Sequence, residues 1–430
     1  MYLHRVILDH IRGFEHLDFT LARPDGSYAG WTVFTGDNGA GKSTLLKAIA
    51  MGLTGRDTAR ALQPNLNQWV RHGSPDEKGS ITLEISRVAQ DDTFVSTGKT
   101  PVSRFSANLL LRNTSRETII EIPAKRKSLL PSERSIWAVD APGWFSCGYG
   151  PFRRVFGASS EATQLMMAPR TQRFATMFQE AASLQQATQW LRELRYKALE
   201  GRRVDQEQLD MLLELFNDSL LPNQLRIDRV DSDGLWLEDR HGIQVVWEDM
   251  SDGYRAMLAL LTDILRHLID TYGTQGLFAH DSEGNVIINR SGVVLIDEID
   301  AHLHPEWQRE IGFWLKQRFP HIQFLVSTHS PIICQAADPN GLFVLPEPGG
   351  DQQPMALSED DYQKVIASRP DTILLTSAFG LENTRSPRAV QARSDYARLQ
   401  AKQRAGAKLT ADERRDIEQL ALFAQTDEEL

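Results

Sequence analysis

The sequence predicts an α/β fold, a mixed sheet plus an antiparallel β lobe, with a compact helical insert and a helical C-terminal tail. Apolar runs with the two-residue period of strands alternate with runs that have the spacing of helices. A glycine-rich turn joins one strand directly to a helix that begins at Gly41, and a wholly apolar strand ends at Asp297. We therefore divide the chain into a first lobe, an insert, a second lobe and a tail, at 1–160, 161–222, 223–345 and 346–430.

The composition is that of a folded globular protein. Hydrophobic residues make up 41% of the 430 residues and charged residues 24%. No stretch approaches the roughly twenty consecutive apolar residues of a membrane helix, and the N-terminus is strand-like and unlike a signal peptide. Cys147 and Cys334 form no C-x-x-C pair, which fits a reducing compartment, and we expect both to be buried. We therefore predict a cytoplasmic protein.

Strands dominate the first lobe. Residues 2–34 alternate apolar and polar around a turn, and 80–122 contains three further strand-like runs. A short apolar segment at 136–149 is expected to complete this β-rich lobe.

Helical spacing then dominates residues 161–221. Ser183 and Gln186 are expected to form a capping box in front of a helix that ends at Gly201. The insert is too short for long antiparallel coiled-coil arms, which would show many sustained heptads.

The second lobe returns to strands and helices in alternation. Strand-like runs at 225–247 precede a helix over Tyr254–Ile269, a buried strand at 293–296 and a helix that opens at Pro305. A Pro/Gly-rich segment then leads to a tail with two helices, the second of which starts at the capping box Thr410–Glu413.

A phosphate-binding loop is the strongest motif. It matches G-x-x-x-x-G-K-[ST], followed by Thr44, with the residues Gly36, Asp37, Asn38, Gly39, Ala40, Gly41, Lys42 and Ser43. Backbone N–H groups of such a loop surround the phosphates of a nucleotide at the start of a helix, Lys42 reaches the β and γ oxygens, and Ser43 offers a hydroxyl to Mg²⁺. The alternative is a chance glycine-rich turn, which the strand before it and the helix after it disfavour.

Two carboxylates stand at the end of the apolar run VVLI. Asp297 is placed to hold Mg²⁺, and Glu298 is then free to orient the water that attacks the γ-phosphorus. An ordinary acidic strand end would explain the pair by itself, but the upstream loop favours the nucleotide site.

Met250–Arg255 opens a helix and resembles the signature L-S-G-G-Q of ABC ATPases, with Met for Leu and Asp for the first Gly. Taken alone, ordinary N-capping by Ser251 or Asp252 explains this segment equally well. In ABC ATPases the element faces the γ-phosphate on the second subunit. The resemblance therefore implies that Ser251 and Gly253 contact ATP held by another copy, with two nucleotides sandwiched in a dimer.

Two further segments agree with the same class. Asp300 opens the loop that follows the acidic strand and, by resemblance, belongs to the dimer interface. The segment QFLVSTHS is a strand with His329 at its end, and His329 resembles the switch histidine, which donates to the γ-phosphate and the attacking water. His302 and His304 could be read as metal ligands, but no third ligand cluster accompanies them, and we reject that interpretation.

Other positions are less specific. By resemblance, Arg12 lies near the nucleotide, and Gln63 and Gln68 are the nearest candidates for a metal-sensing glutamine, although no clean Q-loop is visible. The segment Tyr149–Arg154 combines a tight turn with positive charge, and we favour a structural role that pins the insert over a contact with phosphate.

These elements, in this order, resemble the bacterial ABC-type AAA ATPases of the overcoming-lysogeny and RecF-like group over nearly the full length. WVRHG, YGPFRR, RVDSDGLW, SDGYRAMLAL and the tail resemble, within that group, the PtuA family of Septu and some retron anti-phage systems. Overcoming-lysogeny nucleases carry a Toprim domain of about 150 or more residues with a D-x-D motif. Only roughly a hundred residues follow His329, without D-x-D, so we expect no nuclease domain.

The resemblance implies an ATPase with ATP and Mg²⁺ as cofactors and slow or regulatory turnover. It implies a homodimer formed through the ATP sandwich, higher oligomers built from it, and control of a separate effector, an HNH nuclease, as a sensor in anti-phage defence. We expect the effector to bind the insert or the tail.

Two alternatives lead elsewhere. As in RecF-like proteins, the heads could bind DNA directly for repair, but the formal net charge of −10 disfavours indiscriminate binding, while a local basic groove stays compatible with it. The ATPase subunit of a membrane importer fits poorly, because the N-terminal strands and IDEIDAHLHP are not of that type.

Overall fold

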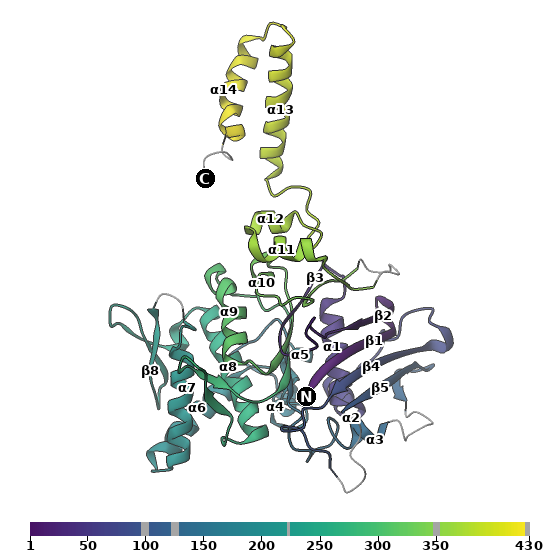
Figure 1. Ribbon diagram of the computed structural model, residues 1–430, viewed down its shortest axis with the longest axis vertical. Coiled ribbons are helices and arrows are strands. Elements are labelled where there is room, and N and C mark those ends of the chain that lie inside the picture. The colour runs from purple at the N-terminus through teal and green to yellow at the C-terminus, as the bar shows by residue number, and fades with distance from the viewer. Residues whose placement is uncertain (96–102, 122–128, 222–223, 347–352, 426–430) are drawn as a thin grey trace. The chain divides into compact units, whose positions relative to one another are not determined.

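The computed structural model describes residues 1–95, 103–121, 129–221, 224–346 and 353–425. The chain forms two compact units, Met1–Pro370 and Asp371–Leu430. The first unit contains both larger sheets and the candidate site (Figure 1). The division into four regions made from the sequence stays a prediction.

The first sheet is almost wholly parallel. Its order is β16-β15-β3-β14-β13-β7, with only β16 antiparallel. The strands are β3 (Gly30–Thr35), β7 (Ser146–Tyr149), β13 (Gly292–Ile296), β14 (Ile322–Ser327), β15 (Leu342–Val344) and β16 (Met355–Ala356). Both faces of β13 and β14 are buried, which explains their continuous apolar sequence. Because β3, β13, β14 and β7 run parallel, their carboxyl ends meet at one edge of the sheet.

The second sheet is antiparallel and has the order β2-β1-β4-β5-β6. Its strands are β1 (Tyr2–Ile11), β2 (Phe14–Thr20), β4 (Lys78–Ser86), β5 (Arg104–Asn113) and β6 (Thr118–Glu121). Buried residues alternate with half-buried ones along β4, as expected for a sheet with one face on a core.

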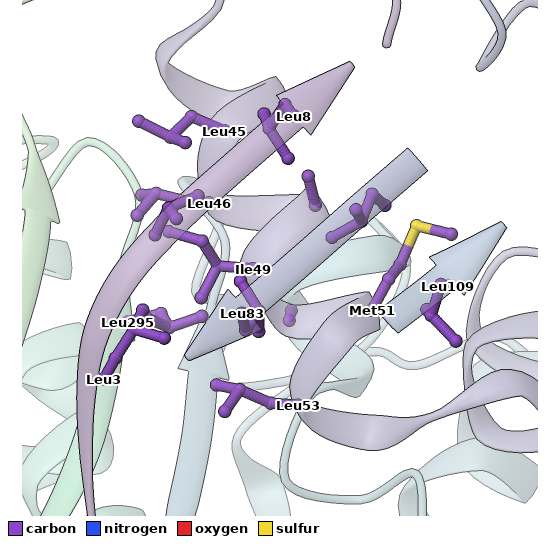
Figure 2. Packing of buried hydrophobic residues seen from close by; sticks show 14 of the residues in the cluster. Leu3, Leu8, Leu45, Leu46, Ile49, Met51, Leu53, Leu83, Leu109 and Leu295 are labelled. Carbon is purple, nitrogen blue, oxygen red and sulfur yellow. The ribbon is translucent and has the colours of Figure 1, made fainter. Parts of the chain in front are cut away.

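Helix α1 (Lys42–Thr54) fills the space beside both sheets. Figure 2 shows its leucines and Ile49 packed among apolar side chains of β1, β4 and β5 and against Leu295 of β13. All of these residues are at most 2% exposed. We call this cluster around α1 the apolar core.

Two smaller sheets and several helices complete the first unit. The strands form the sheet β8 (Arg226–Asp231), β9 (Gly234–Glu238) and β10 (Gln244–Val246), and the hairpin β11 (Phe278–His280) and β12 (Val286–Ile288). The longer helices are α4 (Ser160–Met167), α6 (Gln185–Leu199), α7 (Arg203–Asn217), α8 (Asp252–Tyr272), α9 (Pro305–Arg318) and α11 (Glu359–Ala367). The shorter ones are α2 (Arg56–Leu62), α3 (Leu130–Glu133), α5 (Ala175–Phe178) and α10 (Pro331–Cys334).

Helix α12 (Pro370–Leu374) spans the boundary, and the second unit contains α13 (Pro387–Arg404) and α14 (Ala411–Gln425). The capping box at the start of α14 is confirmed. The Thr410 amide donates to Glu413 Oε2 over 2.8 Å, and the Glu413 amide donates to Thr410 Oγ1 over 3.2 Å. Among the described residues no helix is long and apolar enough to cross a membrane.

Two predictions of local structure are wrong. The capping box at Ser183 does not form, because α6 begins at Gln185 and the Ser183 amide donates to Met166 Sδ instead. Within the segment 136–149 only β7 is a strand, and it extends the parallel sheet beside β13 and not the antiparallel lobe. A strand of four residues carries too little pattern to indicate which sheet it joins.

Candidate nucleotide site

The glycine-rich loop turns from the end of β3 into α1 through residues that need glycine. Gly36, Gly39 and Gly41 have φ of 139°, 85° and 92°, a region that other residues rarely adopt. A Cβ on Gly41 would also lie 2.6 Å from the ring of Phe14. The loop is therefore fixed both by backbone conformation and by its contact with the antiparallel sheet.

Lys42 is held inside this loop. Its Nζ donates to the carbonyl oxygens of Gly36 over 2.8 Å and of Asp37 over 3.0 Å. Partial burial lowers the pKa of Lys42, and the charges of Asp297 and Glu298 oppose that effect. The ammonium is thus bonded to the loop and is attracted by the two carboxylates predicted to work with it.

Asp297 and Glu298 follow β13, as predicted, and one hydroxyl from β14 holds both. Ser327 Oγ donates to Asp297 Oδ1 over 2.5 Å and accepts the Glu298 amide over 2.8 Å. Asp297 is 1% exposed, and its own amide donates to the Tyr149 carbonyl of β7. Glu298 adopts a left-handed backbone conformation, with φ of 46°. This turns the chain sharply as it leaves the sheet.

A cavity of about 560 Å³ opens at this edge of the sheet. Its lining includes Ser43, Asp297, Glu298 and His302, together with Lys47 and Glu180. The structure thus brings the end of the glycine-rich loop and the acidic strand end to one space, as the sequence predicts for a nucleotide site.

Asp300 and His329 lie on neighbouring segments. Thr328 Oγ1 donates to Asp300 Oδ1 over 2.5 Å, and the same oxygen accepts the Ser330 amide. His329 follows directly and is exposed at the end of β14. Both residues therefore stand at the edge of the parallel sheet, although neither lines the cavity.

The segment around Ser251 lies apart from the cavity. Ser251 is the exposed residue in front of α8, and its side chain makes no capping hydrogen bond. A Cβ on Gly253 would come within 2.3 Å of the His302 carbonyl, so only glycine fits there. Ser251 and Gly253 do not line the space that Ser43 lines in their own chain.

The less specific candidates are scattered. Arg12 has φ of 48°, and its guanidinium lies 4.4 Å from the ring centroid of Trp69. Burial lowers the pKa of Arg12. Gln63 Nε2 donates to the Asn65 carbonyl, and neither Gln63 nor Gln68 lines the cavity.

The cysteines are confirmed as buried. In the described part of the chain, no group of three or more His, Cys, Asp and Glu side chains could hold a metal ion.

Sequence reasoning missed three residues of this edge. Ser327 and Thr328 stand at a strand end without a predicted role, yet their hydroxyls fix Asp297 and Asp300. Lys47, one turn beyond the loop, lines the cavity, and burial lowers its pKa against the charge of Asp297. Hydroxyl residues at the end of the strand beside an acidic strand end are the signal that could have found the first two.

A family model described as "AAA domain, putative AbiEii toxin, Type IV TA system" matches residues 31–335, which include the loop, the acidic strand end and His329. The Septu protein PtuA of Bacillus mycoides (strain KBAB4) is 28% identical over 320 residues, or 74% of this chain and 36% of that protein. The Septu protein PtuA of Bacillus thuringiensis is 26% identical over 45% of this chain and 46% of its own length. The "Retron Ec83 probable ATPase" of Escherichia coli is 35% identical over 30% of this chain and 22% of its own length.

The chain thus spans less than half the length of each of these relatives. Solved structures resemble this chain at lower sequence identity. An Smc head bound to the C-winged helix domain of ScpA gives a TM-score of 0.45 at 15% identity, covering 84% of this chain and 99% of that one. The SMC head domain from Thermotoga maritima gives 0.43 at 15% identity, covering 83% and 100%.

Proposed function

Since the chain belongs to this AAA-domain family, we propose that it binds ATP with Mg²⁺, hydrolyses it in a site shared by two copies, and uses the nucleotide state to control a separate effector. The observation that carries the ATPase proposal is the meeting of Ser43, Asp297 and Glu298 at one cavity. The neighbouring Lys42 is held in the glycine-rich loop and feels the charge of both carboxylates. Phosphoryl transfer requires a loop that binds phosphates, a carboxylate that holds the metal and a second residue that positions the attacking water.

The residues fit MgATP. The loop contributes backbone N–H groups through Gly36, Gly39 and Gly41, and Lys42 contributes charge for the β- and γ-phosphates. Ser43 and Asp297 would hold Mg²⁺, which neutralises charge on the phosphates when bound.

Glu298 serves the attacking water in this proposal. Ser327 fixes the Asp297 carboxylate and the Glu298 amide, which leaves the Glu298 carboxylate to orient water at the cavity. His329, exposed at the end of β14, donates to the γ-phosphate and the water. The main contributions are position and charge, because phosphoryl transfer needs little covalent chemistry from the protein.

The second copy completes the site. Ser251 is exposed at the start of a 21-residue helix and does not line the cavity of its own chain. The backbone N–H groups at a helix N-terminus attract anions, and the Ser251 hydroxyl makes no capping hydrogen bond. This helix end therefore suits a phosphate held by another chain. We propose that Ser251, Gly253 and Asp300 face the nucleotide of the second copy.

Glu298→Gln tests the shared site. The amide keeps the size of the side chain and removes the charge that orients water, so hydrolysis should fall about 100- to 1000-fold while ATP stays bound. Light scattering after size exclusion should show dimers at saturating ATP. Lys42→Ala is the matched control, which should lose nucleotide and stay monomeric. A monomeric Glu298→Gln protein at saturating ATP would contradict the shared site.

We further propose that the effector is an HNH-type nuclease of an anti-phage system. The support is the likeness to proteins named for Septu and retron systems. The insert 161–222 and the tail 346–430 are the proposed surfaces for it, because the heads contact each other. Co-purification with the product of the neighbouring reading frame, followed by mass and DNA cleavage with and without ATP, tests this. Tight binding of duplex DNA without a stable protein partner would favour direct action on DNA.

A further inference from the structure

Arg153 is a buried arginine that holds the loop after β13. It follows β7 by four residues and is 4% exposed. Its Nη1 donates to the Asp297 carbonyl over 2.9 Å, and its Nη2 donates to the carbonyls of Glu298 over 3.0 Å and of Ala301 over 3.2 Å. One guanidinium thus satisfies several backbone oxygens of the segment Glu298–His302, which we call the acidic loop.

The acidic loop needs such support because its backbone is strained. Glu298 and His302 both have positive φ, 46° and 67°. A non-glycine residue in this region raises the energy by about 1 to 3 kcal/mol and persists only where its surroundings hold it. The rigid fork of an arginine presents N–H groups from separate nitrogens to carbonyls that lie apart, a fixed spacing that the single nitrogen of an ammonium cannot reproduce.

The charge of Arg153 also matches its surroundings. Asp297, Glu298 and Asp300 place three carboxylates within four positions of the chain. Burial lowers the pKa of Arg153 to about 10, against the attraction of these three carboxylates. The guanidinium is therefore positively charged at neutral pH and lies beneath a negatively charged loop.

The acidic loop faces two sides. Glu298, Ala301 and His302 line the cavity, while the His302 carbonyl lies so close to Gly253 that no Cβ fits between them. A shift of the acidic loop would therefore move Glu298 at the cavity and loosen the start of α8 together.

We propose that Arg153 is a positioning residue for ATP hydrolysis, which sets the conformation of the acidic loop and thereby the aim of Glu298, without touching the nucleotide. The inference rests on the proposed ATPase function. The expected contact of Tyr149–Arg154 with the insert is present, because Arg154 pairs with Ser183 and its carbonyl accepts the Leu184 amide. Arg153 has a further role in the same segment, since it fixes the acidic loop.

Arg153→Ala in the full chain is the test. A displacement of Glu298 by about 1 Å is enough to lower kcat about 100-fold, whereas Kd for a fluorescent ATP analogue should change less than about threefold, because Lys42 and the glycine-rich loop are intact. Arg153→Lys should lose about tenfold in kcat, since one ammonium replaces the fork. Free guanidinium at low millimolar concentration should restore part of the kcat of Arg153→Ala and leave the wild type unchanged.

Arg318→Ala is the matched control for stability. Arg318 is also buried, at 6% exposure, and pairs with Asp218 at the far end of α9. It should lower the melting temperature without lowering kcat. Wild-type kcat in Arg153→Ala, or a loss of kcat that guanidinium does not relieve and that Arg318→Ala shares, would overturn the proposal.

Hydrogen exchange separates this inference from the proposed function. In the wild type the Ala301 amide donates to the Glu298 carbonyl and the Leu303 amide to the Asp300 carbonyl. Both amides should exchange faster in Arg153→Ala. If the wild type has no ATP turnover, the proposed function fails, and the exchange rates alone then decide whether Arg153 holds the acidic loop. Unchanged exchange would overturn that role.

Discussion

The body of α1 and its N-terminus have different surroundings. Along its length the helix lies in the apolar core, where Leu45, Leu46, Ile49 and Leu53 contact strands of both sheets (Figure 2). At its N-terminus it meets a polar edge. Glycines with positive φ, carboxylates fixed by hydroxyls and backbone carbonyls held by a guanidinium form this edge. The core depends on area and volume, which many apolar side chains supply. The edge depends on particular atoms at particular distances, so stability and activity should separate along one helix.

The largest expected effect lies in the core. Leu53→Ala, at a site 1% exposed, should lower the free energy of unfolding by about 2 to 5 kcal/mol, since it leaves a cavity between α1 and the antiparallel sheet. Urea denaturation measures this loss. Leu199→Ala, at a site 65% exposed, is the control and should change stability by less than about 0.5 kcal/mol. The comparison breaks if the folded Leu53→Ala protein binds ATP tenfold more weakly with its stability unchanged.

Local motifs could be predicted from the sequence, whereas long-range pairings could not. The glycine-rich loop and the place of Asp297 and Glu298 at the end of an apolar strand were predicted, because local chemistry demands these residues at these spacings. The place of β7 beside β13 was not, since that pairing joins segments more than a hundred residues apart.

The hydroxyl of Ser327 and the fork of Arg153 escaped prediction for the same reason. Each acts on a backbone or carboxylate of another segment. The sequence can single out Tyr149–Arg154 and the hydroxyl at the end of a strand, but it does not indicate which distant groups they contact. Residues that act through local conformation can thus be predicted from the sequence, while residues that act across the fold need the structure.

Gly41→Ala has an intermediate expected effect and tests the junction of the two regions. The added Cβ meets the ring of Phe14 at 2.6 Å and sits at φ of 92°, so stability should fall by about 1 to 3 kcal/mol and nucleotide affinity should fall with it. Calorimetry of nucleotide binding and urea denaturation report the two losses.

Adding Phe14→Leu to Gly41→Ala separates the two causes. The smaller side chain relieves the contact with the ring but not the backbone strain. Part of the stability should therefore return while affinity stays low. Full recovery of both would mean that the conformation of Gly41 has no role of its own.

The smallest expected effect is a loss of stability in acid through buried His267 of α8. The Tyr149 hydroxyl donates to Asp263 Oδ2 of α8 over 3.0 Å, and His267 Nε2 lies 3.3 Å from the same oxygen and 3.2 Å from Arg266 Nη2. Burial lowers the pKa of His267, more than the charge of Asp263 raises it. Folded His267 therefore takes up a proton at lower pH than unfolded His267 does.

Because the unfolded state then binds more protons, the stabilisation from neutral His267 is complete above about pH 6.5 and is lost as the pH falls below it. Between pH 7.5 and 5.5 the wild type should lose more stability than His267→Asn does, measured by urea denaturation at each pH. His304→Asn, whose side chain is 76% exposed, should keep the loss of the wild type. If His267→Asn loses as much stability in acid as the wild type, other groups cause the pH dependence. The contacts between α8 and β7 would then contribute the same stability at both pH values, as the apolar core does.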